Sequence, residues 1–247
     1  MADFKYEKRI VIYLDILGFQ SKISESINNQ EVFNSIHKAL TNIYSDKFKN
    51  DNGPLKGTEY GTQISVFSDN IVYSEPYNNK GSWFSFILSI YWLINEILWD
   101  GFLTRGAIVI GDLYHDEKIV FGPALNEAYR LESEVAVYPR VIFTSDTIEE
   151  GLKTALYGDV NEDIRYLNQI VSLDEDGLFF INNLSKKHDF DDEETYLDLL
   201  FRAKKIIEDG LTNQDTKAKA KYEWLKHQYN ALYEDDIDAR APGKIYI

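Results

Sequence analysis

The stretch that decides the fold lies near the start of the chain and reads Lys8-Arg9-Ile10-Val11-Ile12-Tyr13-Leu14-Asp15-Ile16-Leu17-Gly18-Phe19. Its apolar run from Ile10 to Leu14 predicts a strand that is buried on both faces of a sheet. Asp15 interrupts this run, and a buried charge is costly unless a metal or another cation pairs with it. Gly18 allows a tight turn that brings backbone amides close to a ligand. The alternative is that Asp15 only caps the helix that follows.

Length and composition predict a folded globular protein. The chain has 247 residues, of which 44% are hydrophobic and 14% aromatic, enough for one large core. It contains no cysteine, which excludes disulfides and thiolate metal sites. The polar residues 1–9 do not resemble a signal peptide, and the apolar stretch 83–99 carries too many polar residues to span a bilayer. We therefore expect a cytoplasmic protein without a membrane partner.

The charge balance is strongly acidic. The 26 Lys and Arg residues face 41 Asp and Glu residues, which gives a net charge of −15. Such a field repels nucleic acid and acidic membranes, so we expect no nucleic-acid partner. Small anionic ligands stay possible, because metal ions and helix N-termini can hold them locally.

The order of the predicted elements indicates an α+β fold. Helices are expected over 20–49, 81–99, 124–133 and 145–157, and strands over 8–17, 102–110, 141–143 and 178–181, with a hairpin over 62–74 and a polar excursion over 111–118. This is a ferredoxin-like βαββαβ core with an added αβαβ extension. The composition changes near Leu184, so we predict a domain over 1–183 and a helical C-terminal extension over 184–247 packed on it. In that extension Trp224, Leu225 and Tyr229 are expected to be packing anchors, while the four histidines of the chain are expected at the surface.

Four segments together carry a resemblance to a known family. They are Asp15-Ile16-Leu17-Gly18-Phe19, Ser68-Asp69-Asn70 at the hairpin tip, Arg105-Gly106 with Gly111, and the helical segment from Phe121 to Glu132. In this order, over residues 8–182, they resemble the catalytic domain of class III nucleotide cyclases. That family uses an Asp-x-x-Gly-Phe stretch, a second metal-binding Asp, and a Gly-x-x-x-Asn-x-Ala-x-Arg-Leu-Glu helix.

The resemblance implies roles for five residues. Asp15 and Asp69 would hold two Mg²⁺ or Mn²⁺ ions per site, with the Ile16 carbonyl as a further ligand. Asn126 would orient the ribose and Arg130 would stabilise charge on the α-phosphate of a nucleoside triphosphate. In that family the carboxylates and this helix come from different subunits, so a homodimer with shared active sites is implied. The alternative is that Asn126 and Arg130 form an ordinary solvated helix face.

The chain departs from the purine-specific members of the family at the base. Ser65 and Ile119 occupy the two positions at which purine cyclases carry base-reading polar groups, and we place both in the substrate site together with Phe19. Because a site built for one base edge rejects others, their loss argues against ATP and GTP. This pattern resembles the pyrimidine cyclases of bacterial Pycsar anti-phage defence. The resemblance implies UTP as the favoured substrate, CTP as possible, and a separate effector that senses the cyclic nucleotide.

Other interpretations stay open. The family's phosphate-binding lysine has no clear counterpart, and Arg140, Lys153 and Arg165 are possible substitutes. Its absence suits a non-catalytic nucleotide-binding or regulatory module on the same fold. A purine cyclase is a further alternative. A polymerase-like palm with the same two carboxylates is disfavoured by the net charge.

Overall fold

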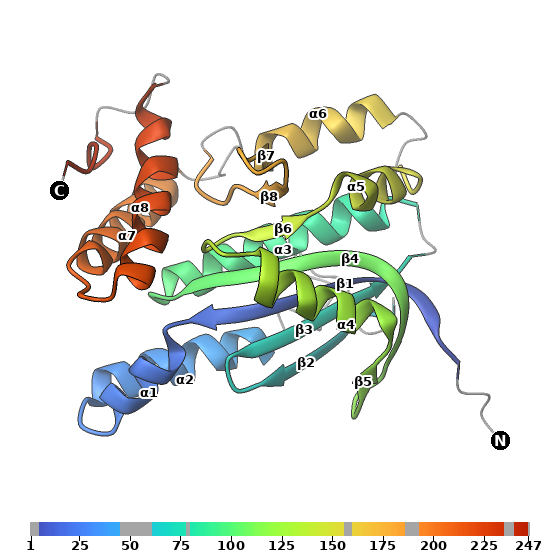
Figure 1. Ribbon diagram of the computed structural model, residues 1–247, viewed down its shortest axis with the longest axis horizontal. Coiled ribbons are helices and arrows are strands. Elements are labelled where there is room, and N and C mark those ends of the chain that lie inside the picture. The colour runs from blue at the N-terminus through green and yellow to red at the C-terminus, as the bar shows by residue number, and fades with distance from the viewer. Residues whose placement is uncertain are drawn as a thin grey trace.

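An eight-stranded sheet organises the chain, with helices on both of its faces (Figure 1). The computed structural model describes residues 5–44, 61–77, 80–155, 160–185, 193–234 and 240–246. The strands are β1 (Glu7–Leu17), β2 (Gln63–Phe67), β3 (Asn70–Pro76), β4 (Leu103–His115), β5 (Val120–Phe121), β6 (Val141–Phe143), β7 (Val171–Leu173) and β8 (Phe179–Ile181). The helices are α1 (Phe19–Ser26), α2 (Gln30–Tyr44), α3 (Ser82–Trp99), α4 (Pro123–Arg130), α5 (Ser145–Leu152), α6 (Val160–Ile170), α7 (Glu193–Leu211) and α8 (Thr216–Ala231), with a π-helical turn η2 (Leu131–Val135) and a 3₁₀ turn η3 (Leu232–Glu234).

The strand order confirms the predicted α+β class and its ferredoxin-like core. The order is β2-β3-β1-β4-β6-β8-β7, and β5 pairs with β4 outside this path. Strand β1 lies between β3 and β4 and is antiparallel to both. Helices α1 and α2 connect β1 to β2, and α3 connects β3 to β4, which completes the βαββαβ unit. Strand β6 then continues the sheet parallel to β4.

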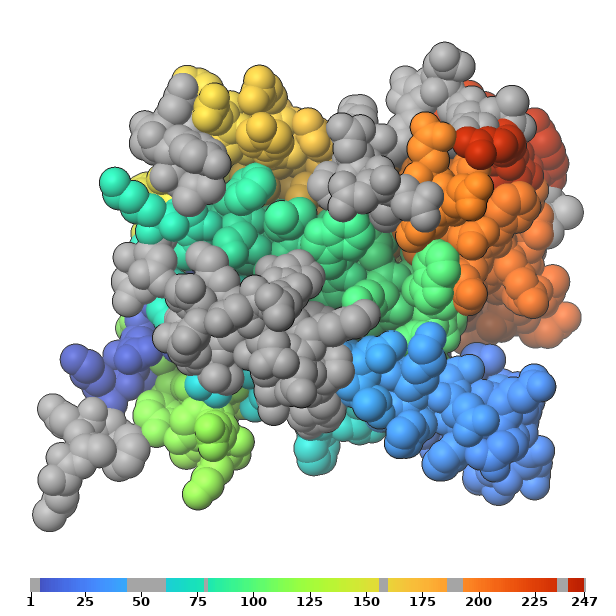
Figure 2. Space-filling view, turned by 180° about the vertical axis from the view of Figure 1, so that it is seen from behind, coloured from blue at the N-terminus to red at the C-terminus, as the bar shows by residue number. Residues whose placement is uncertain are grey.

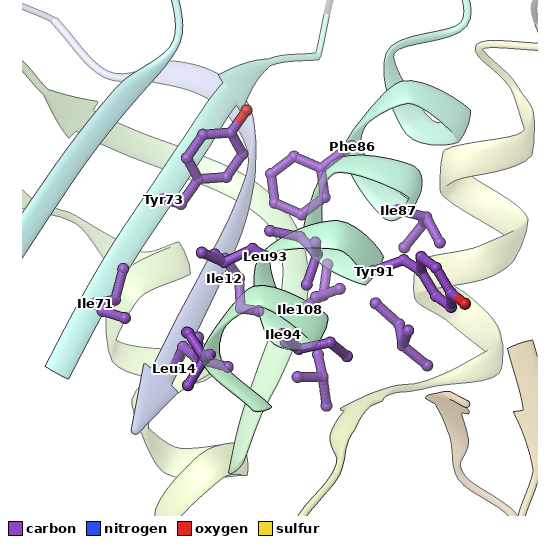
Figure 3. Packing of buried hydrophobic residues seen from close by; sticks show 14 of the residues in the cluster. Ile12, Leu14, Ile71, Tyr73, Phe86, Ile87, Tyr91, Leu93, Ile94 and Ile108 are labelled. Atoms are coloured by element: carbon purple, nitrogen blue, oxygen red, sulfur yellow. The ribbon is translucent and has the colours of Figure 1, made fainter. Parts of the chain in front are cut away.

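Strand β1 is buried on both faces, as its apolar run predicts. Its even-numbered residues, from Ile10 to Ile16, pack in a cluster with α2, α3 and α6. Figure 3 shows Ile12 and Leu14 facing Phe86 and Ile94 of α3. On the other face Val11 belongs to a second cluster with α4 and η2. Asp15 therefore points to the face that α4 covers, since side chains alternate along a strand.

Helix α3 packs against the centre of the sheet. By length and composition this helix could cross a membrane, and it is one such helix among the described residues. However, 67% of its apolar window is buried inside the structure. This burial is that of a core helix, as the sequence predicted.

Several predicted elements have different boundaries in the structure; the helix expected over 145–157, for example, ends at Leu152. The single helix expected from residue 20 is divided into α1 and α2, because the Asn29 side chain accepts hydrogen bonds from the amides of Glu31 and Val32 and starts a new helix. Its predicted end, at residue 49, lies outside the described residues. Strand β4 runs on to His115, through the segment expected as a polar excursion, because Gly111 and Leu113 still pair with β1.

The C-terminal helices pack beside the end of α3. Helices α7 and α8 share a hydrophobic cluster with Leu98 of α3 and with Leu184. Seen from behind, the C-terminal helices (orange and red) and the α1–α2 pair (blue) form separate projections at the same side of the molecule (Figure 2). The predicted domain boundary at 183/184 stays a prediction, although the expected packing of a helical extension is observed.

A buried arginine ties α8 to the far part of the sheet. Arg140 is 3% exposed and forms ion pairs with Asp174 and Asp176. Its guanidinium carbon lies 5.6 Å from the ring centre of Trp224, and that indole donates a hydrogen bond of 3.0 Å to Asp174. Trp224 also stacks on Tyr138 at 5.3 Å. The predicted anchoring role of Trp224 is confirmed, and the two terminal nitrogens of Arg140 are used in pairing with Asp174 and Asp176.

We expect Arg140→Ala to lower the free energy of unfolding by about 3 kcal/mol or more, because Asp174 would keep a buried charge without its cation. Urea unfolding followed by tryptophan fluorescence measures this change. Arg165→Ala is the matched control, since Arg165 is exposed and lies over Tyr166. A loss below about 1 kcal/mol in Arg140→Ala would contradict the anchoring role.

Candidate active site

The two predicted metal carboxylates lie at the same end of neighbouring strands. Asp15 pairs in register with Asn70, so Asp69 immediately precedes the residue opposite Asp15. The Ile16 amide donates a hydrogen bond of 2.9 Å to the Asp69 carbonyl, which fixes the hairpin tip against β1. The structure thus brings Asp69 next to Asp15 and Ile16, although Asp69 lies more than fifty residues after them in the sequence.

The hairpin tip is held in a particular conformation. Ser68 has φ 59°, a left-handed backbone that a residue other than glycine rarely adopts. The Asn70 side chain donates 3.1 Å to an Asp69 carboxylate oxygen and accepts 2.6 Å from the Tyr13 hydroxyl. These contacts orient the Asp69 carboxylate, and a strained turn kept in place in this way is typical of functional sites.

The turn after β1 is made by glycine. Gly18 has φ 73° and is the N-cap residue of α1 without a side-chain hydrogen bond to the helix. Asp15 therefore does not cap that helix, and the alternative interpretation of Asp15 is wrong. Its side chain, 20% exposed, is left for another partner.

In the structure, the partner of Asp15 is a guanidinium shared with a second carboxylate. Arg105 of β4 lies 3.6 Å from Asp15 and donates a hydrogen bond of 2.6 Å to Glu132 of η2. Burial raises the pKa of Asp15; Arg105 acts against this, and the neighbouring Asp69 adds to it. Burial likewise raises the pKa of Glu132, with Arg105 again opposing. We call Asp15, Asp69 and Glu132 the carboxylate cluster.

The donor set fits a hard divalent cation. Asp15 and Asp69 offer carboxylate oxygens, and Mg²⁺ is usually held by one or two carboxylates together with waters and substrate phosphates. Among the described residues there is no group of three or more His, Cys, Asp or Glu side chains with the geometry of a complete metal cage. The arrangement therefore suits an ion that arrives with a phosphate ligand, and does not suit a closed structural site. The Mg²⁺ or Mn²⁺ assignment stays a prediction.

Asn126 and Arg130 lie on the exposed face of α4. The opposite face of this helix, with Ala124 and Ala128, packs on the sheet. Arg130 forms ion pairs with Glu127 at 2.7 Å and Glu134 at 3.5 Å on its own helical segment. Among the described residues of a single chain, no ion pair joins Arg130 to Asp15 or Asp69. Within one subunit Arg130 is thus part of a solvated face, and its role in catalysis stays a prediction.

Besides Asn126 and Arg130, three further residues were predicted to bind the substrate, and they have different environments. Phe19 is 5% exposed and packs near Phe102 in the core, so any contact with substrate would involve its main chain. Ile119 is 53% exposed in the connection between β4 and β5. Ser65 of β2 is half-buried, and its hydroxyl lies 3.0 Å from the His115 ring. None of the three side chains carries a charge at these positions.

His115 is buried, so its predicted surface position is wrong. The ring is 8% exposed, with Nε2 at 3.0 Å from Ser65 and Nδ1 at 2.8 Å from Ser74. The Ser74 hydroxyl also accepts a hydrogen bond of 2.9 Å from Arg9. If Ser74 donates its single proton to Nδ1, then Nε2 carries the ring proton and donates to Ser65. The Ser65 proton is then directed away from the ring. The extension of β4 past Gly111, which the sequence pattern did not indicate, is what buries His115.

The burial of His115 makes stability depend on pH. Burial and the neighbouring Arg9 lower its pKa to about 4, while Asp116 acts in the opposite direction. In the unfolded chain the ordinary histidine pKa of 6.5 applies, so below pH 6.5 the unfolded state binds a proton that the folded state does not. Stability from this group is therefore present above pH 6.5 and is lost as the pH falls toward 4.

We expect the free energy of unfolding of the wild type to fall by about 2 kcal/mol more than that of His115→Gln between pH 7 and pH 5. Urea unfolding at both pH values measures the difference. His37→Gln is the matched control, because His37 is exposed and its loss should leave the pH dependence unchanged. Equal slopes for the wild type and His115→Gln would show that the ring is charged or solvated in the folded state.

The candidate replacements for a phosphate-binding lysine are engaged elsewhere. Arg140 belongs to the Trp224 cluster, Lys153 pairs with Glu150 at 2.5 Å, and Arg165 lies over Tyr166. The structure instead brings Lys221 of α8 into electrostatic contact with Asp15 and Glu132. Sequence reasoning missed Lys221, because its position depends on how α8 packs. The only signal was its spacing of three and four residues from Trp224 and Leu225.

This chain is similar to known proteins in backbone structure, and the matching structures have low sequence identity to it. No family model matches the chain, and no curated protein matches it. Among solved structures, the adenylyl cyclase CyaB from P. aeruginosa matches with a TM-score of 0.47 and 13% identity, over 72% of this chain and 94% of that one. A bacterial light-regulated adenylyl cyclase matches with a TM-score of 0.46 and 16% identity, over 82% of this chain and 100% of that one.

Proposed function

We propose that this chain is a metal-dependent nucleotide cyclase that converts a pyrimidine nucleoside triphosphate, with UTP favoured over CTP, into a 3′,5′-cyclic nucleotide and pyrophosphate. The observation that supports the proposal is the position of Asp69 next to Asn70, the residue opposite Asp15, at one end of the sheet, where the Ile16 amide holds the Asp69 carbonyl. Two oriented carboxylates, one of them with a raised pKa, are a suitable place for divalent cations bound to phosphates.

The reaction is an in-line displacement at the α-phosphorus. The ribose 3′-oxygen forms a bond to phosphorus, the bond to the bridging oxygen of the β-phosphate breaks, and pyrophosphate leaves with that electron pair. The 3′-hydroxyl proton is released to solvent. Bound Mg²⁺ or Mn²⁺ would supply a lower pKa for the 3′-hydroxyl and neutralise phosphate charge. Asp15 and Asp69, with the Ile16 carbonyl, would hold these ions.

The proposed active form is a homodimer with two shared sites. On α4, Asn126 and Arg130 are spaced four residues apart and lie on its exposed face, so a second subunit can reach both. Asn126 of the partner subunit would orient the ribose. Arg130 of the partner subunit would stabilise charge that develops on the α-phosphate. The exposed position of Arg130 within one chain supports this arrangement.

The preference for a pyrimidine rests on the two base-reading positions. Ser65 offers a hydroxyl held by His115, and Ile119 offers an exposed apolar side chain. Neither provides the charged or acidic group by which purine cyclases select their base. A pyrimidine, which is smaller and does not need those groups, therefore fits better. A purine cyclase is the alternative within the same class.

The proposal extends to a cellular role by resemblance. We place the protein in the cytoplasm, as the source of a second messenger in anti-phage signalling that a separate effector senses. Its support is the likeness of the base-reading positions to those of pyrimidine cyclases. A rise of cUMP or cCMP in phage-challenged cells carrying the gene, and none in cells carrying Asp69→Ala, would be the expected result.

The test of the proposed activity uses the pure protein with each of the four nucleoside triphosphates and Mn²⁺ or Mg²⁺. Products are separated by chromatography and identified by mass. We expect cUMP, with cCMP second, and one pyrophosphate per cyclic nucleotide. Purine products alone would replace the pyrimidine assignment, and no cyclic product from any triphosphate would overturn cyclase activity.

A non-catalytic nucleotide-binding module is the second candidate. The observation in its favour is that Arg105 lies beside Asp15 and that Arg130 is paired with glutamates of its own segment. This candidate predicts nucleotide binding without turnover that Asp69→Ala leaves unchanged. The cyclase proposal predicts the opposite on both counts.

A further inference from the structure

Lys221 lies close enough to the carboxylate cluster for Asp15 and Glu132 to act electrostatically on its ammonium group. Among the described residues, no hydrogen bond or ion pair is found for this side chain. It is half-buried, and its electrostatic neighbours include Asp15, Glu132 and Arg105. Burial lowers its pKa and Arg105 acts in the same direction, whereas the two carboxylates favour its charged form. A partly exposed ammonium group of this kind can accept an anion from solvent as a hydrogen-bond partner.

The packing of α8 fixes where Lys221 lies. Lys221, Trp224 and Leu225 are spaced at i, i+3 and i+4, so they share one face of the helix. Trp224 is held by its stack on Tyr138 and its hydrogen bond to Asp174. This face of α8 is therefore tied to the sheet one turn after Lys221, and the lysine is not on a freely moving segment.

The position of Leu225 shows that the face of α8 with Lys221 lies near the end of β1. It borders a small void of about 20 Å³ together with Leu103 and Thr104, the residues that lead into Arg105. Thr104 pairs in register with Ile16. Figure 1 shows the early part of α8 beside the end of β1 and the start of β4. The helix thus approaches the strands at the end where Asp15 lies.

Within the part of the chain that the structure describes, charge pairing in the carboxylate cluster leaves the Lys221 ammonium group available for a ligand. Arg105 is already bonded to Glu132 and lies beside Asp15, so its donors are directed within the protein. Lys221 is the cation near these groups that has no such bond among the described residues. An ammonium group binds phosphate oxygens well, because it is a compact charge with three donors.

We propose that α8 is part of the active site and that Lys221 binds the phosphate chain of the nucleotide substrate, from the same chain that supplies Asp15 and Asp69. The proposal rests on the proposed function, which brings a triphosphate to these carboxylates. It gives the C-terminal extension a direct role in substrate binding. The competing explanation is that Lys221 only balances the charge of Asp15 and Glu132.

The test measures binding without turnover. A 3′-deoxynucleoside triphosphate cannot cyclise, since it lacks the attacking hydroxyl, so its dissociation constant can be measured by calorimetry in Mn²⁺. The wild type is first screened with the four 3′-deoxy triphosphates, and the tightest one is compared with the monophosphate of the same base. The variants are Lys221→Ala, Lys221→Gln and Lys221→Arg. Lys219→Ala is the matched control, because Lys219 is exposed on the same helix.

We expect Lys221→Ala and Lys221→Gln to bind the triphosphate about 10- to 100-fold more weakly, the range for losing a hydrogen bond to a charged group. Monophosphate binding should change by less than about threefold, since a single phosphate offers few of the lost contacts. Lys221→Arg should recover most of the affinity, and Lys219→Ala should match the wild type. Circular dichroism checks that each variant is folded.

Two results would overturn the proposal and leave the proposed function standing. Unchanged triphosphate affinity in Lys221→Ala and Lys221→Gln is the first. Equal weakening for triphosphate and monophosphate is the second, because it indicates a general disturbance of the carboxylate cluster. A wild type that binds none of the four triphosphates would instead overturn the proposed function and this proposal together.

Discussion

Replacing Asp69 with alanine is expected to abolish cyclisation, with a loss on the order of 10³-fold or more, while the protein stays folded. Asp69 sits at a two-residue hairpin tip, so its side chain supports no core packing. Removing it deletes a metal ligand beside Asp15 and also relieves a repulsion between like charges. Asp15→Ala is expected to be equally inactive. Product formation from the preferred triphosphate and thermal unfolding are the two measurements.

A matched control distinguishes the loss of a proposed metal ligand from the loss of a negative charge elsewhere in the protein. Asp198→Ala removes an exposed carboxylate from α7, away from the carboxylate cluster. It should keep full activity and the same unfolding temperature. Near wild-type activity in either Asp69→Ala or Asp15→Ala would show that the two-ion assignment is wrong.

Mixing two inactive variants is expected to restore activity, if the sites are shared between subunits. Asp69→Ala and Arg130→Ala chains form heterodimers in which one site carries both changes and the other carries neither. At equal amounts about half of the dimers are mixed, so roughly a quarter of the wild-type sites should be intact. The exposed position of Arg130 on α4, away from any described pairing with Asp69, is the structural reason for this expectation.

Subunit exchange must be demonstrated in the same sample. Two different tags on the two variants allow the mixed dimer to be isolated in consecutive affinity steps, and its activity per dimer should be about half that of the wild type. Asp69→Ala mixed with Asp15→Ala is the control, because both changes fall in the same half-site and every dimer stays inactive. A mixed Asp69/Arg130 dimer that is isolated and inactive would show that both residues act within one chain.

The sequence predicted the core of the fold because local patterns and long-range packing agree there. The burial of β1 on both faces follows from a run of apolar residues that only a central strand can bury in this way. The hairpin with Asp69 at its tip follows from period-two spacing on both sides of a polar turn. The sequence therefore predicted correctly that Asp15 follows a buried apolar run and that Asp69 lies at a hairpin tip.

The parts that the sequence did not predict depend on contacts between distant segments. Asn29 looks like any other polar residue within a helical pattern, yet its side chain starts a new helix. His115 looks like a surface residue until β4 is extended by pairing with the first residues of β1. Lys221 looks like one of several lysines on a charged helix until Trp224 fixes which face meets the sheet. The periodicity of hydrophobic residues within one segment does not reveal such contacts.

The guanidinium shared by Asp15 and Glu132 has a thermodynamic consequence. Glu132 lies two residues after Arg130. A contact that restrains the end of α4 therefore also changes the relative strength of the ion pairs that Arg105 forms with Asp15 and with Glu132. A cation that binds to Asp15 would weaken its ion pair with Arg105 and so favour the ion pair between Arg105 and Glu132. Because such linkage is reciprocal, association into the proposed dimer and binding of the proposed metal ions would change each other's affinity by the same factor. The metal concentration that gives half-maximal activity would then shift with the concentration of the protein itself.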